Sequence, residues 1–241
     1  MSERSDTSPR LPLAGAPAGT ALTTRELEER RLIHRQESVR VHADAFRELR
    51  TRLLMLAGQL GPAGHNFVTL VVPVRHGCGC SFVARNLAAA FAFDDTREAL
   101  LVDCDAAHPA QSEALEVPSE PGLIDYLEHP ETTLEQIVRP TCVPRMQLIP
   151  SGRLRETPGE SFSSFRMRTL VDSLRAHAGN RHLILDGPPA LGSPDARILS
   201  DVADLVVLVV GDGRVSSEEI DKAVACFAPE KFAGVVFNRR P

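Results

Sequence analysis

The chain has 241 residues, of which 43% are hydrophobic and 24% are charged, and its formal net charge is -5. These values fit one globular domain, and they disfavour nucleic-acid binding, which needs a concentrated Lys/Arg surface. The apolar stretches are too short to span a bilayer, and the start of the sequence lacks an apolar core of signal-peptide type. We therefore expect a cytoplasmic protein with a disordered leader over residues 1–24.

N-terminal helices are predicted next, over residues 25–62. Thr23 and Glu26 have the spacing of a capping box, and a charged, helix-forming stretch follows them. The segment 42–58 is amphipathic, and we expect Gly58 and the following "GPAGHN" (61–66) to end its helix. The predicted buried face of this second helix consists of Ala45, Leu49, Leu53 and Leu56.

Residues 63–241 are predicted to form the main domain. Short runs rich in Val, Ile and Leu alternate there with helical stretches, and they show no polar alternation. The runs are 67–72, 99–103, 146–150, 182–186, 205–210 and 232–237. Continuous apolar runs are typical of strands covered on both faces. The sequence therefore predicts an α/β fold with a mostly parallel central sheet and helices on both faces.

Polar residues follow three of the predicted strands. The loop "RHGCGCS" (75–81) lies between a strand and a helix, Asp103 and Asp105 end the second run, and Asp186 ends the fourth. Ligands bind beyond the carboxyl ends of strands in open parallel sheets. Backbone N–H groups at a helix start bind phosphate, and carboxylates bind Mg²⁺ directly or through water.

From about Asp44 onward, the sequence resembles the bacterial tyrosine kinases of capsule and exopolysaccharide synthesis, a family of P-loop ATPases. The resemblance rests on the glycine loop, "DCD" at 103–105, "DGPP" at 186–189 and the closing "GVVFN", in matching order and spacing. It implies a P-loop NTPase-like fold that binds ATP or ADP with Mg²⁺. It also implies a ring-forming helix upstream of the main domain.

The resemblance assigns residues to four roles. The degenerate nucleotide site would comprise Gly77, Cys78, Gly79, Cys80, Ser81, Phe82 and Asn238. The candidate magnesium ligands are Ser81, Asp103 and Asp186, and the candidate catalytic residues are Asp103, Asp105 and Asp186. The candidate oligomer interface is Asp44, Arg47 and Arg50. These charges also fit the solvated face of an amphipathic helix, and the aspartates also fit relics that only cap backbone groups.

The family pattern is broken at several positions. Cys80 stands where the phosphate loop carries its lysine, Val74 replaces the opening glycine, and Ala107 replaces an arginine. The lysine reaches the β and γ phosphates and stabilises charge as the phosphoryl group departs. Tyr126 is the sole tyrosine, so we expect no C-terminal tyrosine cluster. We therefore expect little or no phosphoryl transfer, with nucleotide and Mg²⁺ binding weak or lost.

The main hypothesis is a catalytically impaired kinase relative, peripheral to the inner membrane through its partner. That partner is expected to be a membrane-bound polysaccharide co-polymerase or chain-length determinant, or an active kinase paralogue, and the chain is expected to form a homo-oligomer. The rival is an active tyrosine kinase that uses Arg75 or a neighbouring subunit's group as its cation. A third reading is a redox or zinc sensor built on Cys78, Cys80 and Cys104, with His76 beside them.

Overall fold

The computed structural model describes residues 23–30, 32–33, 40–60, 66–154, 159–176 and 180–239. Most of the predicted leader lies outside these ranges, as does part of the predicted helical region 25–62. The elements are α1 (Thr24–Glu29), α2 (Arg40–Leu60), β1 (Val68–Pro73), α3 (Cys80–Ala92), β2 (Glu98–Asp103), α4 (Gln111–Leu115), α5 (Leu123–Glu128), α6 (Leu134–Ile137), β3 (Arg139–Pro140), β4 (Met146–Ile149), α7 (Gly159–Phe162), α8 (Phe165–Arg175), β5 (Arg181–Asp186), α9 (Asp195–Ser200), β6 (Leu205–Gly211), α10 (Ser217–Val224), the 3₁₀ helix η2 (Pro229–Lys231) and β7 (Phe232–Asn238).

A seven-stranded sheet forms the centre of the described structure, in the order β3-β4-β2-β5-β1-β6-β7. Neighbouring strands pair in parallel, except β3 with β4. All six predicted runs are strands, within one or two residues at each end. Strand β3 was not predicted, because it is a two-residue Arg-Pro segment at the sheet edge. The predicted α/β class is confirmed.

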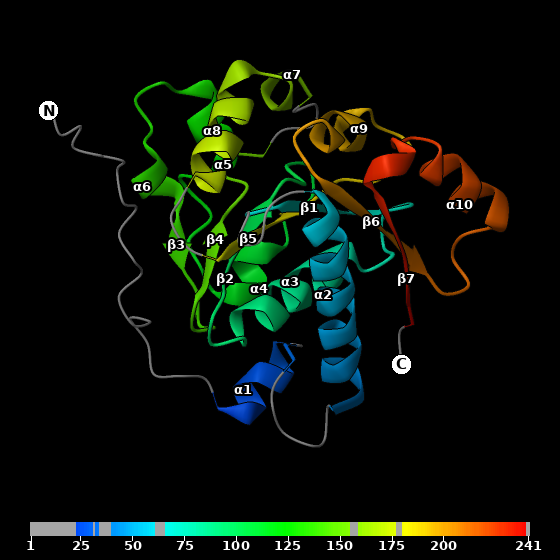
Figure 1. Cartoon of the computed structure of the whole chain (residues 1–241). Helices are drawn as coiled ribbons and strands as arrows, with labels where there is room; N and C mark the ends of the chain where they lie inside the picture. The colour runs from blue at the N-terminus through cyan, green and yellow to red at the C-terminus, as the bar shows by residue number, and fades with distance from the viewer. Residues whose placement is uncertain are drawn as a thin grey trace, which may run out of the picture.

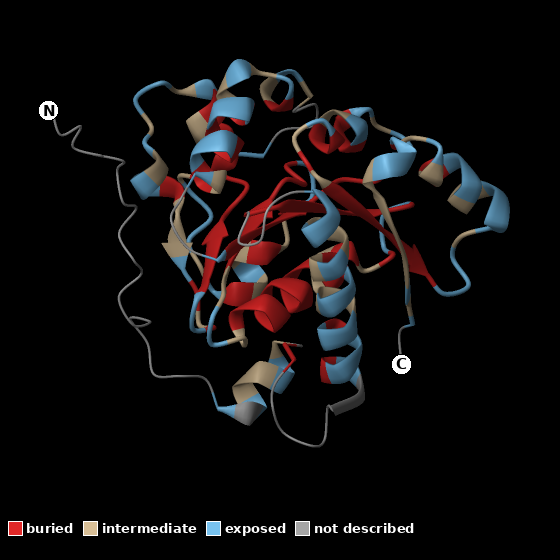
Figure 2. Cartoon of the chain, in the orientation of Figure 1, coloured by how far each residue is buried: buried red, intermediate tan, exposed pale blue. Residues whose placement is uncertain are grey.

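Helices cover both faces of the sheet and create two apolar cores (Figures 1 and 2). One core packs α5, α8, α9 and α10 against strand residues such as Leu70, Leu100 and Leu185. The other packs α2 and α3 against strand residues such as Val71 and Ile184. The alternation of neighbouring residues between two buried faces explains why the runs are apolar throughout.

The long helix α2 differs from its prediction in two ways. Phe46 is buried, with its ring 6.0 Å from that of Phe82, whereas Ala45 is exposed. The prediction that Ala45 lies on the buried face was wrong, because the large aromatic ring of Phe46 packs against α3 instead. The helix continues past Gly58 to Leu60, directly before the "GPAGHN" segment that was also predicted to end it. A glycine within a helix costs only about 1 kcal/mol, which a helix packed along one face tolerates.

The N-terminal capping box is confirmed. The Thr23 side chain accepts a hydrogen bond from the Glu26 N–H group, and the Glu26 carboxylate accepts one from the Thr23 N–H group. The helix it starts is six residues long and ends at Glu29. Within the described part of the chain, no helix combines the length and apolarity needed to cross a bilayer.

Candidate phosphate and metal site

The loop between β1 and α3 has two glycines in a left-handed backbone conformation. Gly77 has φ +82° and Gly79 has φ +83°, in the left-handed region that favours glycine. A Cβ atom on Gly79 would lie 2.1 Å from Nδ2 of Asn238, so only glycine fits. That Nδ2 donates a hydrogen bond to the carbonyl oxygen of Cys78 at 2.9 Å. Asn238, predicted to belong to the nucleotide site, therefore stabilises the loop from the end of β7.

The start of α3 is open to an anion. Gly79 is the N-cap residue, and no side chain caps the first turn. The first N–H groups of a helix have no partner within the helix, and the helix dipole adds partial positive charge there. Since α3 has 13 residues, its N-terminus fits a phosphate group.

The Cys80 side chain turns away from that opening. It is 6% exposed, and its Sγ donates a hydrogen bond to the carbonyl oxygen of Val71 at 3.3 Å. Burial raises the pKa of this thiol well above its ordinary value, and the negative charge of Asp186 adds to the effect. The thiol is therefore neutral, and position 80 supplies no cation to the loop.

Asp103 and Asp186 lie side by side at the ends of β2 and β5, where they are register partners. Both carboxyl groups are buried. Burial raises the pKa of Asp103 to about 8, and repulsion from Asp186 contributes to the shift. The Oδ2 atom of Asp103 accepts hydrogen bonds from the N–H groups of Ala110 (3.1 Å) and Gln111 (3.0 Å). Two of the predicted acids thus meet as the parallel topology requires.

Gln111 connects the two aspartates with the start of α3. It was not predicted from the sequence as a site residue. Its Nε2 donates to Oδ2 of Asp186 at 2.6 Å and to the carbonyl oxygen of Ser81 at 3.0 Å. Burial raises the pKa of Asp186 to about 6, although the nearby side chains of Gln111, Ser81 and Cys80 favour its charged form. The other oxygen of this carboxylate, Oδ1, is buried and has no hydrogen bond of good geometry. Nothing in the sequence near Gln111 marks it as a site residue.

These carboxylates fit a divalent cation. Among the described residues, no Lys or Arg forms an ion pair with Asp103, Asp105 or Asp186. Mg²⁺ takes oxygen ligands, and buried carboxylates without a cation gain most from one. Ser81, Asp103 and Asp186 are the residues that would hold the ion.

Two arginines lie near the loop, and their positions differ. Arg75 forms an ion pair with Glu219 at the start of α10, although it stays largely exposed. Arg214, in the loop after β6, lies against the glycine loop: a Cβ atom on Gly77 would lie 2.9 Å from its Nη1. Arg214, which sequence reasoning did not select, is thus the arginine closer to the glycines.

The three charged residues predicted as an oligomer interface do not all face the same way in the structure. Arg47 and Asp44 form an exposed ion pair at 2.8 Å within α2. Arg50 turns inward, where its Nη1 donates to the carbonyl oxygen of Ala90 at 2.8 Å and lies 3.8 Å from the Asp94 carboxylate. Arg50 therefore joins α2 to α3, and only the other two charges face solvent.

The predicted cysteine cluster does not form a metal-ligand group among the described residues. Cys78, Cys80 and Cys104 are all buried. Burial raises the pKa of Cys80 and of Cys104, the opposite of the lowered value expected for a reactive thiol at a helix start. The described residues therefore do not support the alternative of converging thiol ligands, because these small side chains are buried in the interior.

The fold and the site together define a P-loop NTPase-like protein. The central strand β1 leads through a glycine loop into α3, and the acids stand at the ends of the next strands of the sheet. That arrangement places the backbone N–H groups of the glycine loop and the carboxylates together at the carboxyl ends of the parallel strands, where this class binds its ligands.

Comparison with known proteins identifies the family. Tyrosine-protein kinase YwqD from Bacillus subtilis is 30% identical over 212 residues, which cover 87% of this chain and 86% of YwqD. The chain belongs to the bacterial tyrosine-protein kinase family. EpsB from Ralstonia solanacearum is 34% identical over 197 residues, which cover 81% of this chain but only 25% of EpsB, so the chain spans about a quarter of that relative. No protein-family model matches the sequence.

Solved structures agree with this assignment. The BceF tyrosine kinase domain is 28% identical, with a TM-score of 0.70 over 83% of this chain and 78% of that chain. MinD from Pyrococcus horikoshii, solved with Mg-ADP, has a TM-score of 0.55 at 19% identity and covers 72% of this chain. The likeness to MinD shows the fold alone.

Proposed function

We propose that this chain is a tyrosine-kinase-like protein with impaired phosphoryl transfer, which regulates exopolysaccharide or capsule biosynthesis and chain length. Its partner is a membrane-bound polysaccharide co-polymerase or chain-length determinant, or an active kinase paralogue. It acts as a homo-oligomer on the cytoplasmic side of the inner membrane, held there through that partner. Family membership supports the pathway.

The impairment rests on Cys80. Phosphoryl transfer needs preorganised positive charge at the departing phosphate, and removing one such group costs about 10²-fold or more in rate. The Cys80 thiol is neutral and hydrogen-bonded to the carbonyl oxygen of Val71. The start of α3 therefore offers backbone N–H groups without a side-chain cation, which suits binding better than turnover.

Nucleotide binding without turnover is the state we propose. The left-handed glycines and the open start of α3 fit phosphate groups. Ser81, Asp103 and Asp186 fit Mg²⁺, which supplies positive charge at the phosphates when it is bound. Gln111 holds the Asp186 carboxylate beside the backbone of Ser81, so the site is kept in order.

The sole tyrosine of the sequence is a poor phosphoryl acceptor. Tyr126 lies in α5 and is half-buried. The Arg166 guanidinium lies 4.5 Å from the centre of its ring and donates to its carbonyl oxygen at 2.6 Å. Phosphorylation of Tyr126 would require this packing to open.

One observation favours an alternative, an active tyrosine kinase with a non-standard cation. Arg214 lies against Gly77, where its guanidinium would meet a bound phosphate chain. Arg75, the other candidate, is engaged by Glu219. If the alternative holds, Arg214 carries the charge that the lysine carries in related kinases.

Titration with ATP and ADP, with and without Mg²⁺, tests the proposal. We expect calorimetry to detect binding without hydrolysis over many hours, and absence of binding would overturn the proposed nucleotide-bound state. Phosphate release that disappears in Asp186→Ala would overturn the impairment and favour the active kinase.

Complementation tests the regulatory role. A role without catalysis predicts that Asp186→Asn restores polysaccharide chain length in a deletion strain as well as the wild-type chain does. Failure of this variant, at normal expression and with a normal thermal melt, would show that the Asp186 carboxylate is required, through Mg²⁺ binding or through catalysis, and the ATPase assay above distinguishes the two.

A further inference from the structure

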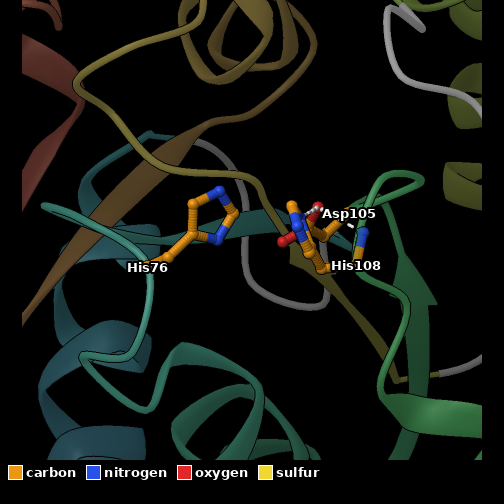
Figure 3. A group of neighbouring side chains, drawn as sticks. All are labelled: His76, Asp105 and His108. Carbon is orange, nitrogen blue, oxygen red and sulfur yellow. Dashed lines mark hydrogen bonds and ion pairs between the residues drawn. The ribbon is translucent and has the colours of Figure 1, made fainter.

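A second group of metal-ligating side chains lies beside the glycine loop, apart from Ser81, Asp103 and Asp186. It consists of His76, in the loop after β1, and of Asp105 and His108, in the loop after β2 (Figure 3). One ligand atom from each residue lies within 4.8 Å of the other two. Two loops that are separate in sequence thus bring their ligands together.

We infer that His76, Asp105 and His108 form a binding site for a divalent transition metal ion, Zn²⁺ or a close analogue. Two imidazole nitrogens and one carboxylate oxygen are a common three-ligand set for such ions, with water completing the coordination. Mg²⁺ prefers oxygen ligands, so the two imidazoles distinguish this site from the neighbouring aspartate pair.

Asp105 is held ready to bind. It is 9% exposed, and its Oδ1 accepts a hydrogen bond from the backbone N–H group of His108 at 3.1 Å. Its Oδ2 accepts no hydrogen bond from any residue in the described ranges, so this oxygen is available to an ion. A hydrogen bond that orients a ligating carboxylate is a typical support for a metal ligand.

The two imidazoles need only small movements to share an ion with Asp105. The ring centres of His76 and His108 are 4.4 Å apart, and both side chains are exposed. Ligand atoms bound to one Zn²⁺ at about 2.0–2.1 Å sit roughly 3.4 Å from each other. Exposed side chains change rotamer freely, so they can close the remaining distance.

The surrounding charge favours a cation. Asp105 is close enough to Asp186 for the two carboxylates to repel each other. No Lys or Arg in the described part of the chain pairs with Asp105, and the Nδ1 atom of His108 lies 3.8 Å from its Oδ1. An ion at this site would also link the glycine loop to the loop after β2, because one ligand comes from the first and two from the second.

Titration of the untagged full chain with ZnCl₂ tests the site, in a buffer without Mg²⁺ and with a phosphine reductant. We expect one equivalent of Zn²⁺ to bind tightly to the wild-type chain. Its affinity should fall at least about tenfold in His76→Ala and in His108→Ala. The exposed His42 on α2 provides the matched control, and His42→Ala should bind as the wild-type chain does. Because the variant side chains are exposed, their melting temperatures should stay unchanged without metal.

Cobalt substitution separates this site from the cysteines. Co²⁺ in a site of imidazole and carboxylate ligands gives visible d–d bands without the near-ultraviolet charge transfer of a thiolate ligand. Equal Zn²⁺ affinity in all three histidine variants, or a thiolate band in the Co²⁺ protein, would overturn the inference. In Asp186→Asn the tight Zn²⁺ equivalent should persist, whatever happens to the response to Mg²⁺.

Discussion

The Cys80 thiol points at the backbone of Val71, with 3.3 Å between Sγ and the carbonyl oxygen. In a phosphate loop, the side chain at this position reaches outward to the nucleotide. The short thiol is instead buried under the start of α3, on the strand side of the loop. At this position the chain therefore presents a buried, uncharged side chain where a phosphate loop presents its lysine.

Cys80→Lys should restore nucleotide affinity. A lysine cannot keep its charge buried at this position, so it will extend toward bound phosphates, where it adds a charged interaction. We expect ATP affinity in Mg²⁺ to rise at least about tenfold, equal to about 1.4 kcal/mol. Cys80→Met is the matched uncharged control, and calorimetry is the measurement. Equal affinities in the two variants would show that the missing cation is not what limits binding.

Arg214 should contribute more to nucleotide binding than Arg75. Its guanidinium lies against Gly77, whereas Arg75 is paired with Glu219. We expect Arg214→Ala to weaken ATP binding about tenfold and Arg75→Ala to weaken it less than about twofold. If binding to the wild-type chain is too weak to measure, the pair is compared in the Cys80→Lys background. A larger loss in Arg75→Ala would reverse the assignment.

His182 should make the protein sensitive to acid. Burial lowers the pKa of this imidazole to about 3, with the charge of Arg97 contributing. Its ring packs 4.5 Å from that of Phe67 and 4.1 Å from that of Phe91. Arginine can only donate, so the 2.9 Å contact with Arg97 Nη1 makes His182 Nε2 the acceptor, and the ring is neutral.

The direction of this pH dependence follows from the lowered pKa. His182 takes up a proton near pH 6.5 in the unfolded chain but only near pH 3 in the folded chain. Its contribution to the free energy of unfolding is therefore complete above pH 6.5 and is lost as pH falls toward 3. Between pH 6.5 and 4.5 the loss is about 2–3 kcal/mol. Chemical denaturation should show a smaller loss in His182→Phe than in the wild-type chain or in His42→Ala. Parallel slopes in all three proteins would refute the assignment.

The sequence predicted what depends on pattern and order. Continuous apolar runs predicted the strands. Because ligands bind at the carboxyl ends of parallel strands, Asp103 and Asp186 were predicted to share one site, and the structure places them as register partners. It could not predict Gln111, because a neutral side chain in a short helix becomes a site residue only through a contact across the sheet edge.

The same limit applies to charges and thiols. Nothing in the order of residues separates an arginine that faces solvent from one that turns inward, and Arg50 turned inward because a carbonyl oxygen at the end of α3 lies within reach. Cys78 and Cys80 looked like ligands because they share a loop with His76, yet the fold buries both thiols and leaves the imidazole exposed beside Asp105. Side-chain direction in a loop is decided by packing, which a motif does not record.

Arg47 and Arg50 should have separable roles in α2. Arg50 makes a charged hydrogen bond to the Ala90 carbonyl oxygen, so Arg50→Ala should lose about 1.5–3 kcal/mol, or several degrees in melting temperature. Arg47 makes only an exposed pair with Asp44, so Arg47→Ala should melt within about 1 °C of the wild-type chain.

Self-association is where Arg47 should matter, if the exposed pair belongs to an interface between subunits. We expect sedimentation velocity to show weaker self-association in Arg47→Ala, with the melting temperature unchanged. The exposed Arg52 on the same helix gives the matched control, and Arg52→Ala should associate as the wild-type chain does. Equal association of all three proteins would leave the Arg47–Asp44 pair as a solvated helix contact worth about 0.2–0.5 kcal/mol.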